Sequence, residues 1–457
     1  MICANGSEVI ASVQELTLRK HEGILGMKSK WEEKQMKSKK AALRMIVALL
    51  AVGVVAFSGC TAGNPKNISE GITEKTDESI SAEEKRKETA VAEENAGQET
   101  KAKEQKEPFK ADRSEVYELF SHINIGWNLG NTLDAAGAGN SLSAETYWGN
   151  PKTTQEMFDA VAGQGFRAVR IPVTYAEHMG KAPDYKIDTK WLDRVQEVVD
   201  YALNAGLYVL LDTHHEPNYW LKPDREHEEE AVAQLGALWS QVAERFRDYD
   251  EKLLFEGMNE PRIKGSANEW NGGTESERKV VDHLNQTFVD AVRKTGGNNE
   301  KRILILCTYG NCASYSGMSD FKIPEDNYIA VAVHMYTPYQ FTFDTPDGGY
   351  SAWDGSRIES ITGVLKLLQK NFLNRGLPVI ITEFGAVNKQ NTKDVVTWIE
   401  DYLGAMNQHE IKCFWWDNNI YDEDGEKFGI FDRRNLTWYN QDIADALIEN
   451  SIYIPEE

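Results

Sequence analysis

Two glutamates, Glu260 and Glu383, each close a short apolar run in a different part of the chain. The first run covers residues 253–260 (LLFEGMNE) and the second covers residues 378–383 (PVIITE). Runs of Val, Ile, Leu and Phe of this length predict strands that are buried on both faces. Parallel strands of an α/β barrel carry their catalytic groups at the C-terminal tips. Two carboxylates delivered to one such edge from distant segments are what cleavage of a glycosidic bond requires.

That chemistry gives the two carboxyl groups different protonation states. In a retaining glycosidase a protonated carboxyl donates to the leaving oxygen, and an ionised carboxylate about 5–5.5 Å away attacks the anomeric carbon. Glu260 and Glu383 are the candidate catalytic pair. An arginine beside a carboxylate keeps it ionised. Arg170 is a candidate for this task at Glu383, with Tyr336 as a second donor.

Polar and aromatic residues also follow the other predicted strands. Taken singly, each has an ordinary structural explanation, such as a salt-bridged arginine, a core histidine or a tryptophan packed at a rim. Together, at the tips of most of eight successive strands, they would face one mouth and form a catalytic constellation. Histidines there can hydrogen-bond sugar hydroxyls, and a tryptophan offers a flat face to a pyranose ring. The candidate substrate-binding and supporting residues are Asn128, Arg170, His214, His215, Asn259, His334, Tyr336 and Trp416.

We expect neither a metal nor a cofactor. His214-His215 followed by Glu216 could be interpreted as a set of metal ligands. The two-carboxylate reaction needs no metal, so the catalytic interpretation is favoured.

The elements that must position these residues follow from the hydrophobic pattern after Ser114. Apolar runs alternate with amphipathic stretches, which indicates repeated βα units and a parallel sheet. The strand candidates are residues 123–129, 166–171, 207–212, 252–257, 302–308, 329–335, 378–382 and 411–416. Helical stretches between them include residues 191–205, 235–246, 278–295, 361–374 and 392–407. Eight strands with intervening helices predict an α/β fold of the (β/α)8 TIM-barrel class.

The chain before the barrel has the character of a targeting segment. A basic stretch at residues 37–44 precedes an apolar run at residues 45–57, which has the length of a signal-peptide core and is short for a membrane span. The run ends in Ala56-Phe57-Ser58-Gly59-Cys60, which resembles a bacterial lipobox, although Phe57 departs from the usual Leu-like residue. Cys60 is therefore the predicted lipidation site. An ordinary secretory signal with an incidental cysteine is the alternative.

A charged linker is predicted between this segment and the barrel. Residues 61–108 contain no aromatic residue and are rich in Glu, Lys, Ala and Thr, so they cannot bury enough apolar surface to fold alone. The predicted organisation is an N-terminal extension with a lipoprotein-type signal peptide at 1–60, a disordered linker at 61–112 and a catalytic domain at 113–457.

Composition and charge restrict the partners. Hydrophobic residues make up 41% and charged residues 27% of the chain, which suits a globular enzyme. Fifty basic against 72 acidic residues give a formal charge of −22. Such a chain repels nucleic acid phosphates and anionic lipid heads, so we expect no nucleic acid partner and membrane contact only through the lipid anchor. We expect a monomer.

The cysteines do not indicate a redox or zinc protein. A C-x-x-C pair is absent, which argues against zinc ribbons and thioredoxin-like chemistry. Cys307 and Cys312 could form a disulfide, but buried free thiols are the favoured interpretation. The five cysteines are Cys3, Cys60, Cys307, Cys312 and Cys413.

The sequence resembles glycoside hydrolase family 5, the large cellulase family, from Ser114 to Asn450. Its sequence motifs are similar to those of the branch that includes endoglucanases, xyloglucanases and mixed-linkage glucanases. Thr382 departs from the pattern, because many relatives carry Gly there. The motifs that carry the resemblance are residues 126–134 (GWNLGNTLD), 148–151 (WGNP), 170–174 (RIPVT), 214–216 (HHE), 255–261 (FEGMNEP), 296–299 (GGNN), 334–336 (HMY) and 414–419 (FWWDNN).

The resemblance implies roles for individual residues of these motifs. Glu260 would be the acid/base, Glu383 the nucleophile, and Asn259 a contact to the sugar 2-hydroxyl. The implied supporting residues are Arg170, His214, His334, Tyr336 and Trp416.

The leading hypothesis is a secreted, lipid-anchored endo-β-1,4-glucanase that acts on cellulose-type β-glucans with retention. Xyloglucan, mixed-linkage glucan, mannan and xylan are alternative substrates for the same barrel. A surface glycan-binding lipoprotein without turnover is the alternative from another class, but a binder has no need of both glutamates.

Overall fold

The computed structural model describes residues 109–343, 348–423 and 425–455, which belong to one compact unit, Gln105–Glu457. The predicted signal peptide, Cys60 and all but the last four residues of the predicted linker lie outside these ranges. Those assignments and the domain boundaries stay predictions. Among the helices of the described ranges, none has both the length and the apolar character that crossing a bilayer requires.

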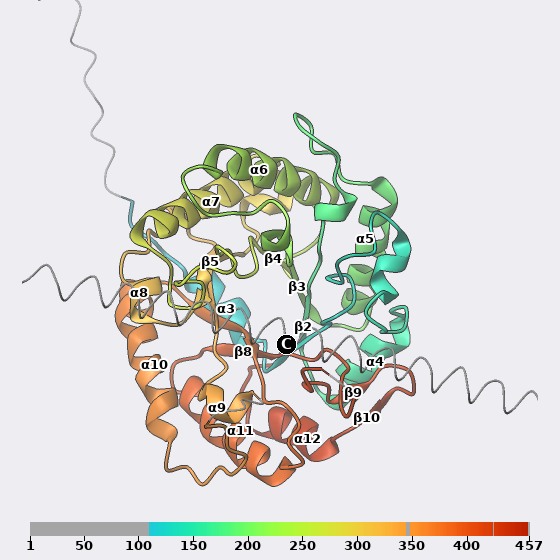
Figure 1. The fold of residues 1–457 in the computed structure, drawn as a ribbon, viewed down its shortest axis with the longest axis vertical. Helices are drawn as coiled ribbons and strands as arrows, with labels where there is room; N and C mark the ends of the chain where they lie inside the picture. The colour runs from blue at the N-terminus through green and yellow to red at the C-terminus, as the bar shows by residue number, and fades with distance from the viewer. Residues whose placement is uncertain (1–108, 344–347, 424, 456–457) are drawn as a thin grey trace, which may run out of the picture. The chain divides into compact units, whose positions relative to one another are not determined.

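Eight parallel strands form a closed barrel in sequence order, and β8 pairs with β1 to close it (Figure 1). The predicted (β/α)8 TIM barrel is thereby confirmed. Each observed strand overlaps its predicted range, and β5 and β7 extend beyond theirs. The strands are β1 (Gly126–Asn128), β2 (Ala168–Ile171), β3 (Tyr208–Asp212), β4 (Leu253–Glu256), β5 (Leu304–Cys312), β6 (Ile329–His334), β7 (Val379–Phe384) and β8 (Lys412–Trp415).

Helices surround the barrel as an outer ring (Figure 1). The ring comprises α4 (Gln155–Gln164), α5 (Thr189–Asn204), α6 (Glu228–Arg245), α7 (Glu275–Arg293), α8 (Tyr315–Met318), α9 (Tyr339–Thr342), α10 (Ile358–Asn371), α11 (Thr392–Asn407) and α12 (Gln441–Glu449). The additional elements are α3 (Ser114–Ser121), β9 (Phe431–Asp432), β10 (Thr437–Trp438), η1 (Leu142–Thr146), η2 (Ala176–His178), η3 (Glu216–Asn218), η4 (Gly297–Glu300) and η5 (Leu373–Arg375). Local signals fix some boundaries. Thr274 and Glu277 form a reciprocal capping box at the start of α7.

Alternate side chains of each strand enter different apolar layers. Residues such as Val209 and Leu211 pack outward against the helices, whereas Leu210 belongs to a second cluster that fills the barrel. Within the barrel, Phe414 lies against Gly126, where a Cβ atom would come within 2.1 Å of the phenyl ring. This close approach accounts for a glycine in the middle of the predicted first strand.

The regular alternation breaks at the C-terminal ends of the later strands. The β6–β7 register shifts between Val333 and His334, and the β7–β8 register shifts between Ile381 and Phe384. Irregularities of this kind redirect side chains and occur often beside active sites. Here they lie at the strand ends where Glu383 and His334 meet.

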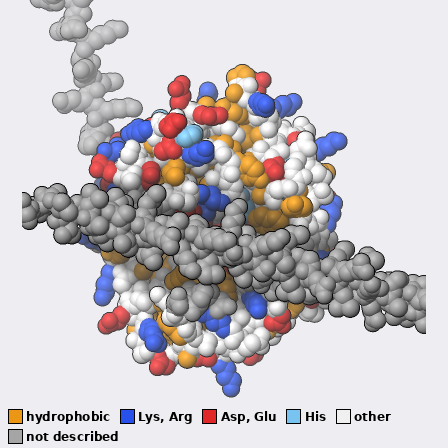
Figure 2. All heavy atoms as spheres, in the orientation of Figure 1, with side chains coloured by type: hydrophobic (Ala, Val, Ile, Leu, Met, Phe, Trp, Pro, Cys, Tyr) orange, Lys and Arg blue, Asp and Glu red, His pale blue; other side chains and the backbone are white. Residues whose placement is uncertain are grey.

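The face seen in Figure 2 has acidic and basic side chains interspersed around the rim of the described unit. Hydrophobic side chains gather towards the upper right of that view. Mixed signs are typical of a water-exposed surface.

Candidate active site

Arg170 is the centre of a polar cluster at the C-terminal mouth of the barrel. It is fully buried in β2, and its guanidinium reaches carboxylates from three other strands. Its Nη1 donates to Glu383 Oε1 at 2.8 Å, and its Nε donates to Glu256 Oε2 at 2.5 Å. Its Nη2 lies 2.6 Å from Asp212 Oδ2. One cation therefore links the ends of β3, β4 and β7.

Two asparagines complete the shell around this guanidinium. Asn128 Oδ1 accepts a hydrogen bond from it at 3.1 Å, and Asn259 Oδ1 accepts one at 2.8 Å. Asn128 also donates to the carbonyls of Thr382 at 3.0 Å and Trp415 at 3.1 Å. Because its side chain is fully buried, Asn128 is placed to support the cluster and join β1 to β7 and β8.

The charges in this cluster do not balance if every group is ionised, because three carboxylates face one arginine. Burial raises the pKa of Asp212 to about 6, although the charge of Arg170 opposes that rise. Burial also raises the pKa of Glu256 against the same opposing charge. Burial opposes the charge on Arg170, but Asp212 and the other carboxylates raise its pKa overall. The arginine stays charged, and the carboxyls of Glu256 and Asp212 bind protons more readily than free carboxyls do.

Glu383 has a hydrogen-bond donor on each carboxylate oxygen. Arg170 occupies Oε1, and the Tyr336 hydroxyl donates to Oε2 at 2.9 Å. Burial, followed by the charge of Glu383, raises the pKa of Tyr336 well above its usual range, so the phenol remains a donor. Donors on both oxygens stabilise the ionised carboxylate. The predicted Arg170–Glu383–Tyr336 arrangement is present.

Glu260 is held by its backbone and by both carboxylate oxygens. Its φ of +45° lies in the left-handed region, and its N–H donates to Asn311 Oδ1 at 2.7 Å. His334 Nδ1 lies 2.9 Å from Oε1, and Arg262 Nη1 lies 3.1 Å from Oε2. Burial opposes ionisation, but His334 and Arg262 lower the pKa of Glu260 to about 2. The carboxylate is therefore ionised in the ligand-free protein.

The two glutamates meet across His334. One carboxylate oxygen of Glu260, one of Glu383 and a ring nitrogen of His334 all lie within 4.8 Å of one another. His334 Nδ1 is 3.4 Å from Glu383 Oε2. Carboxyl groups this close match the separation used for retention rather than the wider one used for inversion.

His214 and His215 are neutral imidazoles, unlike His334. Burial, followed for His214 by the charge of Arg170, lowers the pKa of His214 to about 3. Burial likewise lowers the pKa of His215 well below its usual value. His214 Nδ1 lies 2.9 Å from Asp212 Oδ2, so the proton sits on Nδ1 and Nε2 remains an acceptor. A neutral imidazole with this tautomer can accept from a sugar hydroxyl.

A row of rings leads away from the catalytic pair. Trp416 lies parallel to His214, with centroids 5.6 Å apart and an interplanar angle of 3°. His214 meets His215 edge-on at 4.5 Å, and His215 lies 5.4 Å from Trp148. Trp148 is 40% exposed. His214 and Trp416 are buried, so Trp148 and His215 are the rings of this row that offer an exposed flat face to a pyranose unit.

The other tryptophans of the mouth loops divide into exposed and packed side chains. Trp270 is 55% exposed, and one face of its ring is covered by the Arg262 guanidinium. Trp353 is only 5% exposed and donates to Asp401 at 2.8 Å, which makes it a packed loop anchor. Trp220 is partly buried and donates to Glu216 at 2.5 Å.

The His-His-Glu metal interpretation does not fit the geometry. Glu216 accepts from the Tyr175 N–H at 2.6 Å and from Trp220, so its oxygens turn away from the histidines. His214 and His215 instead cluster with Asp134 within 4.8 Å.

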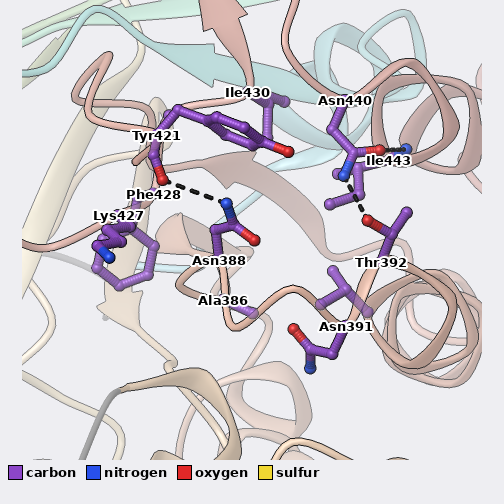
Figure 3. A pocket seen from close by; sticks show the side chains of 12 residues that line it. Ala386, Asn388, Asn391, Thr392, Tyr421, Lys427, Phe428, Ile430, Asn440 and Ile443 are labelled. Atoms are coloured by element: carbon purple, nitrogen blue, oxygen red, sulfur yellow. Dashed lines mark hydrogen bonds between the residues drawn. The ribbon is translucent and has the colours of Figure 1, made fainter. Parts of the chain in front are cut away.

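A small pocket lies between the loop after β7, the start of α11, the loop after β8 and α12 (Figure 3). Some of its polar groups are paired with one another. Asn388 donates to the Tyr421 carbonyl at 3.2 Å, and Asn440 donates to Thr392 Oγ1 at 2.7 Å. Phe428 lines this pocket and also packs 5.5 Å from the Tyr336 ring. The pocket therefore lies behind the wall that supports Tyr336.

Several functional contacts were missed by the sequence interpretation. Asp212 ended a predicted strand and Glu256 lay within a motif, and neither was predicted as a site residue, although a carboxylate inside a buried strand needs a cation. That requirement, with Arg170 in a neighbouring strand, was the available signal. Arg262 gave no periodic signal because it lies in a loop, and Asn311 lies in the part of β5 beyond the predicted strand, where the register is irregular. Cys307, Cys312 and Cys413 are free thiols as expected, with Cys312 only partly buried.

Comparison with known proteins identifies the barrel. A family model described as cellulase (glycosyl hydrolase family 5) matches residues 132–422. The chain belongs to glycoside hydrolase family 5. The match covers seven of the eight strand ends described above, from β2 to β8, and includes both glutamates.

Individual relatives of this family 5 chain are described as endoglucanases. Endoglucanase A of Ruminococcus albus is 50% identical over 337 residues, which cover 73% of this chain and 92% of that protein. Endoglucanase A of Clostridium longisporum is 42% identical and is covered over 65% of its length.

Solved structures give the same fold. A family 5 xyloglucan-specific endo-β-1,4-glucanase from a metagenomic library, in complex with cellotriose, is 57% identical with a TM-score of 0.73. The alignment covers 74% of this chain and 99% of that one. A family 5 lichenase from Caldicellulosiruptor sp. F32 is 38% identical with a TM-score of 0.69, covering 75% and 96%.

Proposed function

We propose that this protein is a retaining endo-β-1,4-glucanase that hydrolyses internal bonds of β-glucans. The observation that carries the proposal is the approach of Glu260 and Glu383 carboxylate oxygens to within 4.8 Å in the mouth of a family 5 barrel. Endoglucanase relatives at 40–50% identity support the substrate class.

In the first step Glu383 is the nucleophile. Its ionised carboxylate, oriented by Arg170 and Tyr336, attacks the anomeric carbon and forms a covalent glycosyl ester. Protonated Glu260 gives its proton to the glycosidic oxygen as the bond to the leaving chain breaks. In the second step ionised Glu260 takes a proton from water, the hydroxide attacks the same carbon, and Glu383 leaves as a carboxylate. Two inversions give net retention.

The proton that Glu260 must donate is shared with His334. Burial opposes a charge on His334, but Glu383 and the hydrogen bond with Glu260 raise its pKa above the ordinary value. In the ligand-free protein these shifts favour the proton on His334 over Glu260. We expect the proton to pass to Glu260 across their 2.9 Å contact when a sugar binds. The two groups titrate as a pair, and the alkaline limb of kcat/KM reports loss of their shared proton.

Glu260→Gln tests the role of the acid/base. Glutamine keeps the shape of the side chain but has no proton to donate and cannot act as a base, so kcat/KM on carboxymethyl cellulose should fall about 10²–10⁴-fold. An aryl β-cellobioside with a strongly acidic phenol needs less help in departure, so glycosyl-enzyme should form and accumulate as a burst of phenol. Release of reducing sugar and stopped-flow phenol release are the measurements.

The matched control is Glu359→Gln, an exposed glutamate in the first turn of α10. That variant should match the parent on both substrates. If Glu260→Gln hydrolyses carboxymethyl cellulose as fast as the parent, the assignment of roles is wrong.

Xyloglucan is the second candidate substrate. It has the same β-1,4-glucan backbone, and the 57%-identical structure is that of a xyloglucan-specific enzyme. A panel of cellulose, barley glucan, xyloglucan, xylan and mannan separates the alternatives. A rapid fall in viscosity with few reducing ends formed would establish internal cleavage.

A lipid anchor and an extracellular location are supported by sequence alone. The basic stretch, the apolar run and the lipobox-like Ala56-Phe57-Ser58-Gly59-Cys60 are the supporting features. With Cys60→Ala the protein should move from the membrane fraction to the soluble fraction and lose incorporation of a labelled fatty acid. Unchanged fractionation and labelling would contradict the anchor. The catalytic unit is proposed to act as a monomer, which size-exclusion chromatography tests.

A further inference from the structure

Arg262 contacts the acid/base from the loop between β4 and α7. Its Nη1 lies 3.1 Å from Glu260 Oε2 and donates to the Glu260 backbone carbonyl at 2.9 Å. The guanidinium thus contacts both the side-chain carboxylate and the backbone carbonyl of Glu260. Because His334 already occupies Oε1, Arg262 determines where the second oxygen points.

The arginine is itself fixed from two sides. Its Nε donates to Glu269 Oε1 at 3.1 Å, and its guanidinium carbon lies 4.2 Å from the centroid of the Trp270 ring. Glu269 is anchored in turn by the Gly265 N–H, which donates to Oε2 at 2.7 Å. A stacked and ion-paired guanidinium has little rotational freedom. The side chain of Arg262 is only 13% exposed, so water screens its charge weakly.

We propose that Arg262 is a positioning residue that orients Glu260 and makes it a stronger acid. This inference rests on the proposed acid/base role of Glu260. When the proton moves from the Glu260 carboxyl to the glycosidic oxygen, Glu260 becomes an anion beside a fixed cation. Arg262 therefore favours the first step. In the second step the same charge weakens Glu260 as a base towards water.

The other titratable groups near Glu260 cannot replace this effect. His334 exchanges its proton with Glu260, and the neighbouring carboxylates carry the opposite charge. Arginine is the one side chain in this set that remains cationic at every working pH. The groups that face Glu260 or interact with its charge are Arg262 on its own loop, Cys312 at the end of β5, His214 and His215 after β3, His334 and Tyr336 from β6 and its loop, Glu383 on β7 and Glu426 after β8.

Arg262→Met tests the proposal, because methionine fills space but carries no charge. On barley glucan, kcat/KM should fall about tenfold. The alkaline limb of its pH profile should shift to higher pH by about one unit. On an aryl β-cellobioside with a strongly acidic phenol, where the second step limits the rate, kcat should stay within about twofold of the parent or rise. Arg262→Lys keeps the cation and should leave the alkaline limb near that of the parent.

Two further variants separate charge from loop structure. Arg278→Met is the matched control, since Arg278 anchors the same loop through the carbonyls of Gly272 and Gly273 without touching Glu260. It should leave the pH profile unchanged. Glu269→Gln removes the anion beside Arg262 and should move the alkaline limb the opposite way, to lower pH.

The results distinguish this inference from the proposed function. Equal losses on both substrates with an unmoved alkaline limb would show that Arg262 serves the fold only and would overturn the inference. The same pH shift in Arg278→Met would overturn it as well. Failure of the proposed function would appear instead as an inactive parent or a fully active Glu260→Gln variant.

Discussion

Glu383→Ala is expected to lower kcat/KM on every β-glucan by at least about 10⁴-fold, the largest effect of any single substitution on activity. The variant has no nucleophile to form the glycosyl ester, and no neighbouring carboxylate is free to replace it. Glu256 and Asp212 are the nearest acidic groups on the Arg170 cluster, but both are fully buried below the mouth. Loss of reducing-sugar release on carboxymethyl cellulose is the first measurement.

Two measurements distinguish the loss of activity in Glu383→Ala from the loss in Glu260→Gln: the dependence of the rate on the leaving group, and the effect of an added anion. An activated aryl cellobioside should not restore turnover by Glu383→Ala, because departure of the phenol is not the missing step. Azide can enter the space of the deleted carboxylate and attack the anomeric carbon directly, so the expected product is the α-glycosyl azide. Formation of the β-azide, or residual activity above about one per cent of the parent on cellulose substrates, would contradict a nucleophilic role for Glu383.

Arg170→Met is expected to cost about 3–5 kcal/mol of unfolding free energy at neutral pH, as well as most of the activity. Removing the cation leaves Asp212, Glu256 and Glu383 together in a buried site, and an unpaired buried charge is strongly destabilising. Chemical denaturation followed by tryptophan fluorescence measures the loss.

The size of this loss should depend on pH. Without Arg170 the carboxyls of Asp212 and Glu256 have folded-state pKa values still further above their unfolded values, so the folded variant binds more protons than the unfolded chain. Stability is then highest at low pH and is lost as pH rises through those folded-state values. The deficit relative to the parent should be smaller near pH 5 than near pH 8.

Arg225→Met is the matched control, since Arg225 is 59% exposed in a surface pair with Glu228. Its stability should stay within about 0.5 kcal/mol of the parent. A deficit for Arg170→Met that is equal at pH 5 and pH 8 would contradict the electrostatic explanation.

The architecture could be predicted because it is encoded locally. Buried parallel strands are short apolar runs, and amphipathic helices repeat at helical spacing, so each βα unit is visible in a window of a few residues. The prediction for α11, residues 392–407, matches the structure at both ends. The range predicted for β7 ended at Thr382, whereas the strand continues to Phe384. The end of β7 was missed because charged Glu383 interrupts the apolar run before Phe384.

The identity of the candidate residues was also accessible from sequence. A polar side chain that follows a buried strand has to lie at the mouth of the barrel, whichever strand it follows. Glu260, Arg170, His334 and Tyr336 could therefore be assigned to one site before any distance was known. The sequence could not distinguish tryptophans that offer a face to a sugar ring from tryptophans that pack within a loop. Trp353 and Trp270 both lie in mouth loops, and only packing shows that the first is buried and the second exposed.

What tertiary structure alone decided is the direction in which side chains point. Strict alternation along β7 sends Thr382 into the barrel, and there it donates to Glu256 at 3.0 Å. The same alternation would send Glu383 out towards the helices, but Glu383 reaches Arg170, because the register shifts at this point. The contacts of Arg262 with Glu260 likewise depend on a loop conformation that Glu269 and Trp270 stabilise. Sequence determined which residues reach the mouth, since periodicity is local; their orientation depends on contacts between strands and loops remote in the chain.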